Sequence, residues 1–202
     1  MDCMEALKEM KDNQYDLAII DPPYGIGEAS GRLRTRKKHT NRVKHKAKNW
    51  DASRPKKEYW AQLFRISTNQ IIWGANYFVE HLLPKMGWIY WDKMIGGDFS
   101  DGELAYTSFD QALKSFSFWN GNNGIPRIHP TQKPVKLYEW LLMNYAKEGD
   151  KILDTHFGSL SIGIACHNLG FDLDAYEIDK EYFEAGKKRL EQHKSQLQLW
   201  QP

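Results

Sequence analysis

Asp21 stands where an apolar run of the chain, 17–20, meets two prolines and Tyr24. Because two prolines cannot continue a sheet ladder, we expect a strand to end at this aspartate. Ligands of open α/β sheets bind beyond the carboxyl ends of the strands. The carboxylate and a free carbonyl of the turn could there accept hydrogen bonds from an exocyclic amine whose ring stacks on the tyrosine. Taken alone, Asp-Pro-Pro-Tyr is typical of a turn, but its position directly after an apolar run favours a ligand-binding site.

A second acidic turn runs from Asp154 to Ser159, between an expected strand and an expected helix. Its carboxylate can bind an ammonium or a hydroxyl, and its Gly158-Ser159 backbone lets a ligand approach closely. Glu177 closes the next expected strand about 20 residues later, at the offset typical of an acid that binds ribose hydroxyls. Such junctions are common in α/β folds, but the pair indicates a cofactor that contains a nucleoside. The sequence has no full GxGxxG motif, so the pattern does not require the cofactor to contain a phosphate.

A third segment, His-Pro-Thr-Gln-Lys-Pro at 129–134, precedes an expected helix. Thr131 or Gln132 could cap that helix, and the helix N-terminus would favour a carboxylate. Taken alone, the segment is an ordinary helix start.

The elements around these segments alternate between helices and short apolar strands, which is typical of a doubly wound, mostly parallel α/β sheet. The final alternation of polar and apolar residues at 196–200 is either one more strand or a frayed end. The expected strands are 17–20, 70–74, 87–91, one or two within 109–118, 151–154 and 172–178, and the expected helices are 4–12, 56–68, 134–146, 161–168 and 179–194.

The small net charge of +2 hides a strong asymmetry. Residues 31–57 carry twelve Lys or Arg and a single acid, Asp51, whereas the rest of the chain carries 16 basic and 25 acidic residues. Such a block is either a solvated loop or an arm that a polyanion neutralises, and nucleic acid is the commonest such polyanion. We predict one domain, 1–202, with a basic arm at about 28–57.

Composition excludes several classes of protein. The mean hydropathy of −0.67 and the lack of a long apolar run exclude a membrane-spanning helix. Two cysteines, Cys3 and Cys166, are too few for a disulfide framework or a cysteine-based zinc site, and they indicate a reducing cytoplasm. The acidic, amphipathic N-terminus is unlike a secretory signal.

Five segments together resemble the β-class of amino DNA methyltransferases, a permuted group that uses S-adenosylmethionine. Asp-Pro-Pro-Tyr at 21–24 resembles the catalytic motif of this family, and Ile-Trp-Gly-Ala-Asn-Tyr-Phe at 72–78 resembles its IWGGNYF segment. The segment 129–134 matches the stretch before the cofactor half. Residues 154–159 resemble the DPFxGSG turn, and 176–183 resemble the stretch GIEIDEEYF. The matching segments run from residue 2 to about 190 in the order of this class.

The resemblance implies a role for each matching residue. Asp21 and the Pro22 carbonyl would accept hydrogen bonds from the target amine, with Pro23 completing the turn and Tyr24 stacking on a flipped base. The cofactor would be S-adenosylmethionine, with no metal, and double-stranded DNA would be the substrate. The predicted cofactor-binding residues are Asp2, at the adenine, with Thr131, Gln132, Lys133, Asp154, Phe157, Gly158, Ser159 and Glu177. The predicted DNA-binding residues are Arg32, Arg34, Arg36, Lys37, Lys38, Arg42, Lys44, Lys46 and Lys48, whose phosphate contacts would give affinity without reading sequence.

The resemblance also implies a Rossmann-like, circularly permuted fold. Its seven-stranded sheet would have the order 3-2-1-4-5-7-6, with strand 7 antiparallel. The acidic turn at 154–159 would follow strand 1, and the catalytic turn at 21–24 would follow the neighbouring strand 4. Strand 3 would have to come from 196–200, so we expect the two ends of the chain to lie close together.

The chain departs from the family pattern in three ways. Thr155 replaces proline, and Leu160 replaces a glycine, which could change the cofactor turn because leucine takes positive φ at a higher cost. Ala75 replaces a glycine in a milder change. The chain also leaves little room for a separate target-recognition domain.

The function expected is direct methyl transfer to adenine N6 of DNA, by an enzyme of a bacterial or phage cytoplasm. Methylation of cytosine N4, methylation of RNA or of a protein glutamine, and an inactive DNA-binding relative are the alternatives. Asp21 favours adenine over cytosine, and it argues against the glutamine enzymes, which usually carry Asn-Pro-Pro-Tyr. A homodimer and a cognate restriction endonuclease are possible partners.

Overall fold

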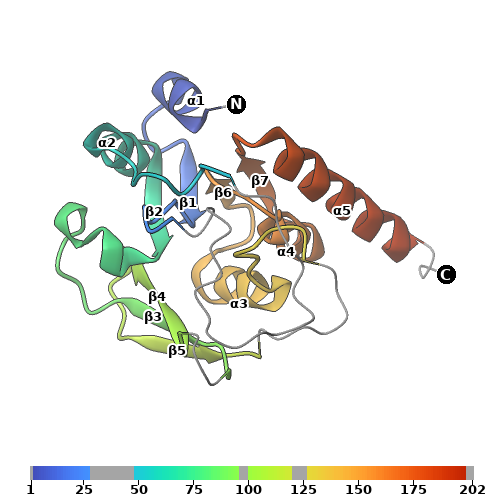
Figure 1. The fold of residues 1–202 in the computed structure, drawn as a ribbon. Coiled ribbons are helices and arrows are strands. Elements are labelled where there is room, and N and C mark those ends of the chain that lie inside the picture. The colour runs from blue at the N-terminus through green and yellow to red at the C-terminus, as the bar shows by residue number, and fades with distance from the viewer. Residues whose placement is uncertain (1, 28–47, 96–99, 120–126, 199–202) are drawn as a thin grey trace.

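The computed structural model describes residues 2–27, 48–95, 100–119 and 127–198 (Figure 1). None of the described helices is both long and apolar enough to cross a membrane. The elements, in chain order, are α1 (Cys3–Glu9), β1 (Tyr15–Ile20), α2 (Lys57–Ile66), β2 (Ser67–Trp73), the 3-10 turns η2 (Ala75–Tyr77) and η3 (Val79–His81), β3 (Trp88–Asp92), β4 (Gly102–Thr107), β5 (Lys114–Ser117), α3 (Val135–Tyr145), β6 (Lys151–Asp154), α4 (Ser161–Leu169), β7 (Asp172–Ala175) and α5 (Lys180–Gln198).

The strands form a single mixed sheet of seven, in the order β5-β3-β4-β2-β1-β6-β7. β1 pairs in parallel with both β2 and β6, and β6 pairs in parallel with β7. β4 runs antiparallel to both of its neighbours, β2 and β3. The predicted α/β class, with seven mostly parallel strands and one antiparallel strand, is confirmed.

Helices cover both faces of the sheet, and this explains why the central strands are apolar without interruption. On β1, Leu17 and Ile19 face a core shared with α3 and α4. Ala18 and Ile20 face the opposite core, which is shared with α1 and α2. With apolar side chains needed on both faces, the run leaves no polar position until Asp21, where the strand ends.

The sequence prediction was wrong at the two edges of the sheet. The segment 196–200 forms no strand within the described residues, because α5 continues through Gln198. Instead the seventh strand is β5, which pairs with β3 at the other edge. The C-terminal end of α5 points away from α1 in Figure 1, so the expected meeting of the two chain ends is also wrong for the described residues.

Strand β4 is absent from the sequence prediction, whereas the prediction of one or two strands within 109–118 is confirmed by β5. Its residues, Gly-Glu-Leu-Ala-Tyr-Thr, mix helix formers with the strand formers Tyr106 and Thr107, so propensity alone does not indicate a strand. Pairing with β2 on one side and β3 on the other forms this strand. Of the segment 109–118, only β5 (Lys114–Ser117) is a strand.

Most of the basic arm lies outside the described residues, and so do all predicted DNA-binding residues except Lys48. The described end of the arm, 48–54, is held by three contacts to the body. Lys48 Nζ lies 2.6 Å from Asp179 Oδ1, next to α5. The Asp51 carboxylate accepts a 2.8 Å hydrogen bond from the Gly25 backbone, and the Arg54 guanidinium lies 3.0 Å from Glu80. The arm therefore returns to the body beside the Asp-Pro-Pro-Tyr turn.

Candidate active site at the carboxyl edge of the sheet

The two acidic turns predicted from the sequence lie at the carboxyl ends of adjacent parallel strands. Ala18 of β1 is opposite Leu153 of β6 in the sheet register. Asp154 is the last residue of β6, and Asp21 directly follows β1. Parallel pairing therefore brings both carboxylates to one edge of the sheet, where open α/β sheets bind ligands.

The Asp21 carboxylate is held by one donor on each of its oxygens. The Tyr24 hydroxyl donates a 2.6 Å hydrogen bond to Oδ1, and the Lys133 ammonium donates to Oδ2 at 2.5 Å. An ionised carboxylate offers about four acceptor positions, so about two stay open to another donor. Pro22 is buried and Pro23 is half-buried, which fixes the backbone of this turn.

Tyr24 is packed into the body of the site. Its ring stacks on Tyr77, with the centroids 4.9 Å apart, and meets the edge of Phe78 at 6.0 Å. Burial, the Asp21 charge and its hydrogen bond raise the pKa of the Tyr24 hydroxyl well above its usual range, so this group stays a donor. The sequence predicted that Tyr24 stacks on a base, and the structure shows that Tyr77 already covers one face of the ring.

Gly74, the residue after β2, makes this packing possible. It has φ +64°, and a Cβ atom there would lie 2.1 Å from Tyr24 Cε1. The glycine is therefore needed for its left-handed backbone and for the close approach of the tyrosine ring. Gly74 and Tyr77 belong to the segment 72–78 that carried the family resemblance, but the sequence alone gave them no role.

Lys133, one of the predicted cofactor contacts, has its side chain buried between two carboxylates of the protein. Its side chain is 3% exposed, and its ammonium lies between Asp21 Oδ2 and Glu103 Oε2, the latter at 3.0 Å. Glu103, on β4, also pairs with Lys93 at 2.6 Å. The ammonium thus lies against two protein carboxylates, and a contact of Lys133 with the cofactor stays a prediction. Sequence reasoning missed Glu103 and Lys93 because it missed β4.

Asp154 is nearly inaccessible, with 1% of its surface exposed. Its Oδ1 accepts a 2.9 Å hydrogen bond from the His156 backbone. Burial raises the pKa of the carboxyl to about 8, the His156 N–H opposes the shift, and the charges of Asp21 and Glu177 add to it. A buried acid that needs a positive partner is a fitting site for an ammonium.

Glu177 ties the cofactor turn to the start of α5. Its Oε2 accepts the Gly158 N–H at 3.0 Å, and its Oε1 accepts the Asp179 N–H at 2.8 Å. Burial raises the pKa of this carboxyl, and the two backbone donors oppose the rise. A contact between Glu177 and a ribose stays a prediction.

The cofactor turn keeps its left-handed residue although a leucine stands there. Leu160 has φ 54° and ψ 33° and precedes α4. Its side chain is 8% exposed and fits against two glycines, since a Cβ on Gly163 would lie 2.8 Å from Leu160 Cγ and one on Gly186 would lie 3.1 Å from Leu160 Cβ. The small neighbours thus make room for the leucine, whose burial offsets the backbone strain.

The other predicted members of the turn are fixed by α5 and β7. The Phe157 ring packs on Phe183 at 5.8 Å, and its backbone N–H donates to Tyr176. Arg189 of α5 donates a 2.8 Å hydrogen bond to the Ser159 carbonyl. Arg189 was missed from the sequence because its position on a polar helix carries no local signal.

The segment 129–134 does not cap the helix that follows. Pro134 is the N-cap residue of α3, and no side chain caps it, so the expected capping by Thr131 or Gln132 is wrong. The Thr131 hydroxyl instead bonds to His129 Nδ1 at 3.1 Å, and Gln132 accepts the Ile128 N–H at 3.1 Å. These bonds shape a turn of their own, and both residues stay predicted cofactor contacts.

Asp2 lies at the start of α1, which it caps by accepting the Met4 N–H at 3.0 Å. Burial lowers the pKa of His156 to about 4, and the Asp2 carboxylate opposes this shift. The charge of Asp2 is thus felt in the cofactor turn, although its contact with an adenine stays a prediction.

Lys48 is engaged by α5. Its ammonium contacts both Asp179 oxygens at 2.6 Å and Glu181 at 3.0 Å, and it lies 4.1 Å from the Tyr182 ring centroid. Two carboxylates pair with it in this structure, and its contact with a DNA phosphate stays a prediction. Lys48 anchors the end of the arm.

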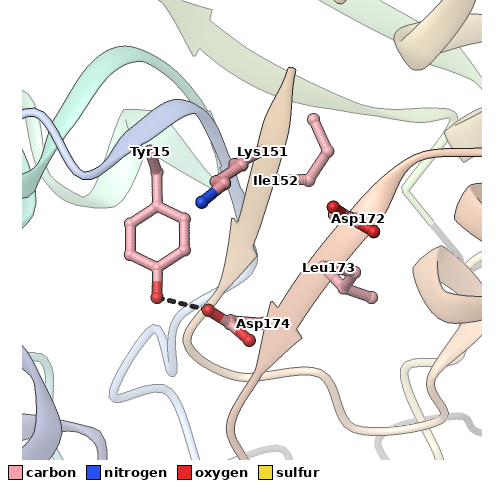
Figure 2. Close-up of a pocket in the computed structure, with 6 residues that line it drawn as sticks. All are labelled: Tyr15, Lys151, Ile152, Asp172, Leu173 and Asp174. Carbon is pink, nitrogen blue, oxygen red and sulfur yellow. Dashed lines mark hydrogen bonds between the residues drawn. The ribbon is translucent and has the colours of Figure 1, made fainter. Parts of the chain in front are cut away.

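A separate pocket of about 260 Å³ opens at the other end of the strands (Figure 2). It is lined by the first residues of β1, β6 and β7, which are Tyr15, Lys151 and Asp172. The Tyr15 hydroxyl donates a 2.7 Å hydrogen bond to Asp174, drawn in Figure 2. Because Asp21 and Asp154 follow the opposite ends of these strands, this pocket is not part of the candidate active site.

An open α/β sheet with two acidic turns at adjacent strand ends is the architecture of a Rossmann-like methyltransferase. Residues 33–188 match the family model of N6 and N4 methyltransferases described as DNA methylase. This match covers more than half of the chain, so the chain belongs to the N6/N4 DNA methylase family.

Three known proteins show the extent of the similarity. The Type II methyltransferase M.HpaI of Haemophilus parainfluenzae is 25% identical over 231 residues, which cover 93% of this chain and 72% of that protein. The Type II methyltransferase M2.DpnII of Streptococcus pneumoniae is 29% identical over 70% of this chain, which spans only 49% of that relative. The crystal structure of an M1.HpyAVI–SAM complex superimposes with a TM-score of 0.63 at 21% identity, covering 94% of this chain and 96% of the other. At this identity, the last similarity shows the fold.

Proposed function

We propose that this protein transfers a methyl group from S-adenosylmethionine to N6 of an adenine flipped out of double-stranded DNA. The observation that carries the proposal is the placement of the Asp21 carboxylate and the 154–159 turn on adjacent parallel strands. An acceptor for an amine and a turn for a nucleoside cofactor thus share one edge of the sheet. Membership of a DNA methylase family supports this reading.

The residues present fit the cofactor. Asp154 is buried, and burial raises the pKa of its carboxyl, so a cation such as the methionine ammonium would stabilise its charged form. Gly158 and Ser159 leave room for a ligand near the backbone, and Glu177 would bind the ribose. Phe157, Thr131, Gln132 and Asp2 complete the proposed cofactor contacts; Lys133 is treated below. When bound, S-adenosylmethionine supplies an electrophilic methyl group.

The work of the protein is to make a poor nucleophile reactive. The lone pair of an exocyclic amine is delocalised into the base, and positive charge builds on nitrogen during methyl transfer. The Asp21 carboxylate and the Pro22 carbonyl would accept hydrogen bonds from the amine N–H groups and stabilise that charge. Tyr24, backed by Tyr77, would present its other face to the flipped base. No covalent intermediate with the protein is needed.

The basic arm would bring DNA to this edge. Its described end, 48–54, is anchored beside the catalytic turn by Asp51 and Arg54. The arm residues 32–46, with their eight basic side chains named above, would contact phosphates. The two curated relatives are named as Type II methyltransferases, so we propose a role in restriction–modification, with a cognate endonuclease and a homodimer as candidate partners.

Single-molecule methylation sequencing of DNA from cells that express the chain tests this function. N6-methyladenine in a defined sequence context is expected, and Asp21→Ala should abolish it. Asp172→Asn, at the far pocket, is a matched control that should leave the mark in place. Methylation of cytosine N4 instead would overturn the adenine assignment. No mark, with no binding of S-adenosylmethionine, would identify an inactive relative.

A further inference from the structure

Four charged side chains of alternating sign form a row behind the catalytic turn. They are Asp21, Lys133, Glu103 and Lys93, and successive members lie within 3.0 Å of one another. They come from four separate parts of the chain, namely the end of β1, the loop before α3, β4 and the residue after β3. The row has no net charge, and Asp21 is the member at the proposed site of the chemistry.

Lys133 is the buried centre of this row. Its side chain is 3% exposed, and its ammonium lies 5.4 Å from the centroid of the Trp73 ring. Burial alone would lower the pKa of this lysine, but the charges of Asp21 and Glu103 outweigh burial, so its pKa is raised and it stays an ammonium. A lysine this buried is retained only when it is paired, and here both partners are carboxylates.

The two donors on Asp21 bind different oxygens of its carboxylate and so fix its orientation. Tyr24 donates a hydrogen bond to Oδ1 and Lys133 donates one to Oδ2, so the Asp21 carboxylate cannot rotate without breaking one of these two bonds. Charge-assisted bonds of this kind are short and strong. The remaining acceptor positions then keep a fixed direction, which is what a weakly nucleophilic amine requires.

We propose that Lys133 is a positioning residue, whose ammonium fixes the Asp21 carboxylate for the target amine while Glu103 holds the ammonium in place. This inference rests on the proposed function of Asp21, and it goes beyond the family resemblance, which implied that Lys133 is a cofactor-binding residue. The two roles predict different kinetics, because a positioning residue acts on the chemical step and a cofactor ligand acts on cofactor affinity.

The first test is Lys133→Met, which removes the charge and keeps the length of the side chain. We expect kcat to fall about 10- to 100-fold at saturating DNA and cofactor, with the Kd for S-adenosylmethionine, measured by calorimetry, within about threefold of wild type. Lys151→Met, at the far end of β6, is the matched control and should leave both values unchanged. A Kd that rises tenfold or more with unchanged kcat would assign Lys133 to the cofactor and overturn the proposal.

The second test separates positioning from charge balance. Lys133→Met leaves the row with a net charge of −1, and the double variant Lys133→Met/Glu103→Gln restores it to zero. Thermal stability should therefore return toward wild type in the double variant, while kcat stays low because Asp21 still lacks its donor. Recovery of kcat together with stability would show that Lys133 only neutralises Glu103, and the inference would be wrong.

Failure of the proposed function is recognised separately. If wild-type protein methylates no DNA, that function falls, and the inference is decided by crystal structures of wild type and the double variant. A displaced Asp21 carboxylate in the double variant would support the positioning role. A carboxylate in its wild-type place, still bonded to Tyr24, would overturn it.

Discussion

Asp154 should make the protein less stable as the pH rises toward neutrality. Its pKa is about 8 in the folded protein, against 3.8 for the free side chain, because burial penalises the charged form. Between these two values the unfolded chain gives up the proton and the folded chain keeps it. Folding then requires a proton to be taken up from solution, and stability falls with rising pH.

Asp154→Asn isolates this effect, because asparagine keeps the shape and the acceptor for the His156 N–H but does not titrate. One pKa unit corresponds to about 1.4 kcal/mol. The variant should therefore gain stability over wild type by about 1.4 kcal/mol for each pH unit between 4 and 8, or about 3 kcal/mol from pH 5 to 7.5. That gain is a large part of an ordinary stability of about 5–15 kcal/mol.

Urea denaturation followed by tryptophan fluorescence at pH 5, 6, 7 and 7.5 measures both proteins. Other titrating groups, such as Glu177, are present in both and cancel in the difference. A difference that does not change with pH would show that Asp154 is ionised in the folded state, and it would refute the desolvation argument. The same variant should bind S-adenosylmethionine at least about tenfold more weakly, since it loses the proposed partner of the ammonium.

Three further substitutions test the packing of the site. Gly74→Ala should lower the free energy of unfolding, measured by urea denaturation, by about 2–4 kcal/mol, because the new Cβ meets the Tyr24 ring. Gly149→Ala is the control, since Gly149 has φ +85° but a Cβ there would meet no described atom within 4 Å, and it should cost only the backbone strain of about 1 kcal/mol. Equal costs for the two variants would contradict the contact with Tyr24. Leu160→Gly should relieve a positive φ yet lower stability by about 1–3 kcal/mol, because a buried side chain is lost, and a more stable variant would contradict this balance. Lys48→Met should lower the free energy of unfolding by at most about 1 kcal/mol, and this cost should shrink in 1 M salt. It should weaken DNA binding, measured by filter binding, less than about threefold. A larger loss of DNA affinity would support the phosphate contact predicted from the sequence.

The central part of the fold was predictable because its signals are local. The run 17–20 is buried on both faces of the sheet, so it is apolar without interruption, and Asp21-Pro22-Pro23 marks its end in the sequence itself. Before Asp154, the buried pair Ile152 and Leu153 forms a shorter apolar run. An apolar run in the sequence therefore reveals both the position of a buried parallel strand and the residues at its carboxyl end.

The rest of the sheet was not predictable because pairing, more than propensity, decides which of its segments are strands. β4 is a strand through its bonds to β2 and β3, which no local pattern reveals. The alternation at 196–200 resembles a strand, yet its first residues continue the 19-residue helix α5. With β4 missing from the prediction, Glu103 and Lys93 could not be placed, and the partner of Lys133 could not be known.

The charges of the site divide it into two unequal halves. Around Asp21, the chain supplies its own balance, since Lys133 and Lys93 match Asp21 and Glu103. Asp154 accepts a hydrogen bond from the His156 N–H, Glu177 accepts hydrogen bonds from the Gly158 and Asp179 N–H groups, and burial raises the pKa of both carboxyls. Lys133 also lowers the pKa of Asp154, but its ammonium is committed to two other carboxylates. A cation brought by a ligand is therefore stabilised most in the Asp154 half, whereas the Asp21 half is already set to receive a neutral amine.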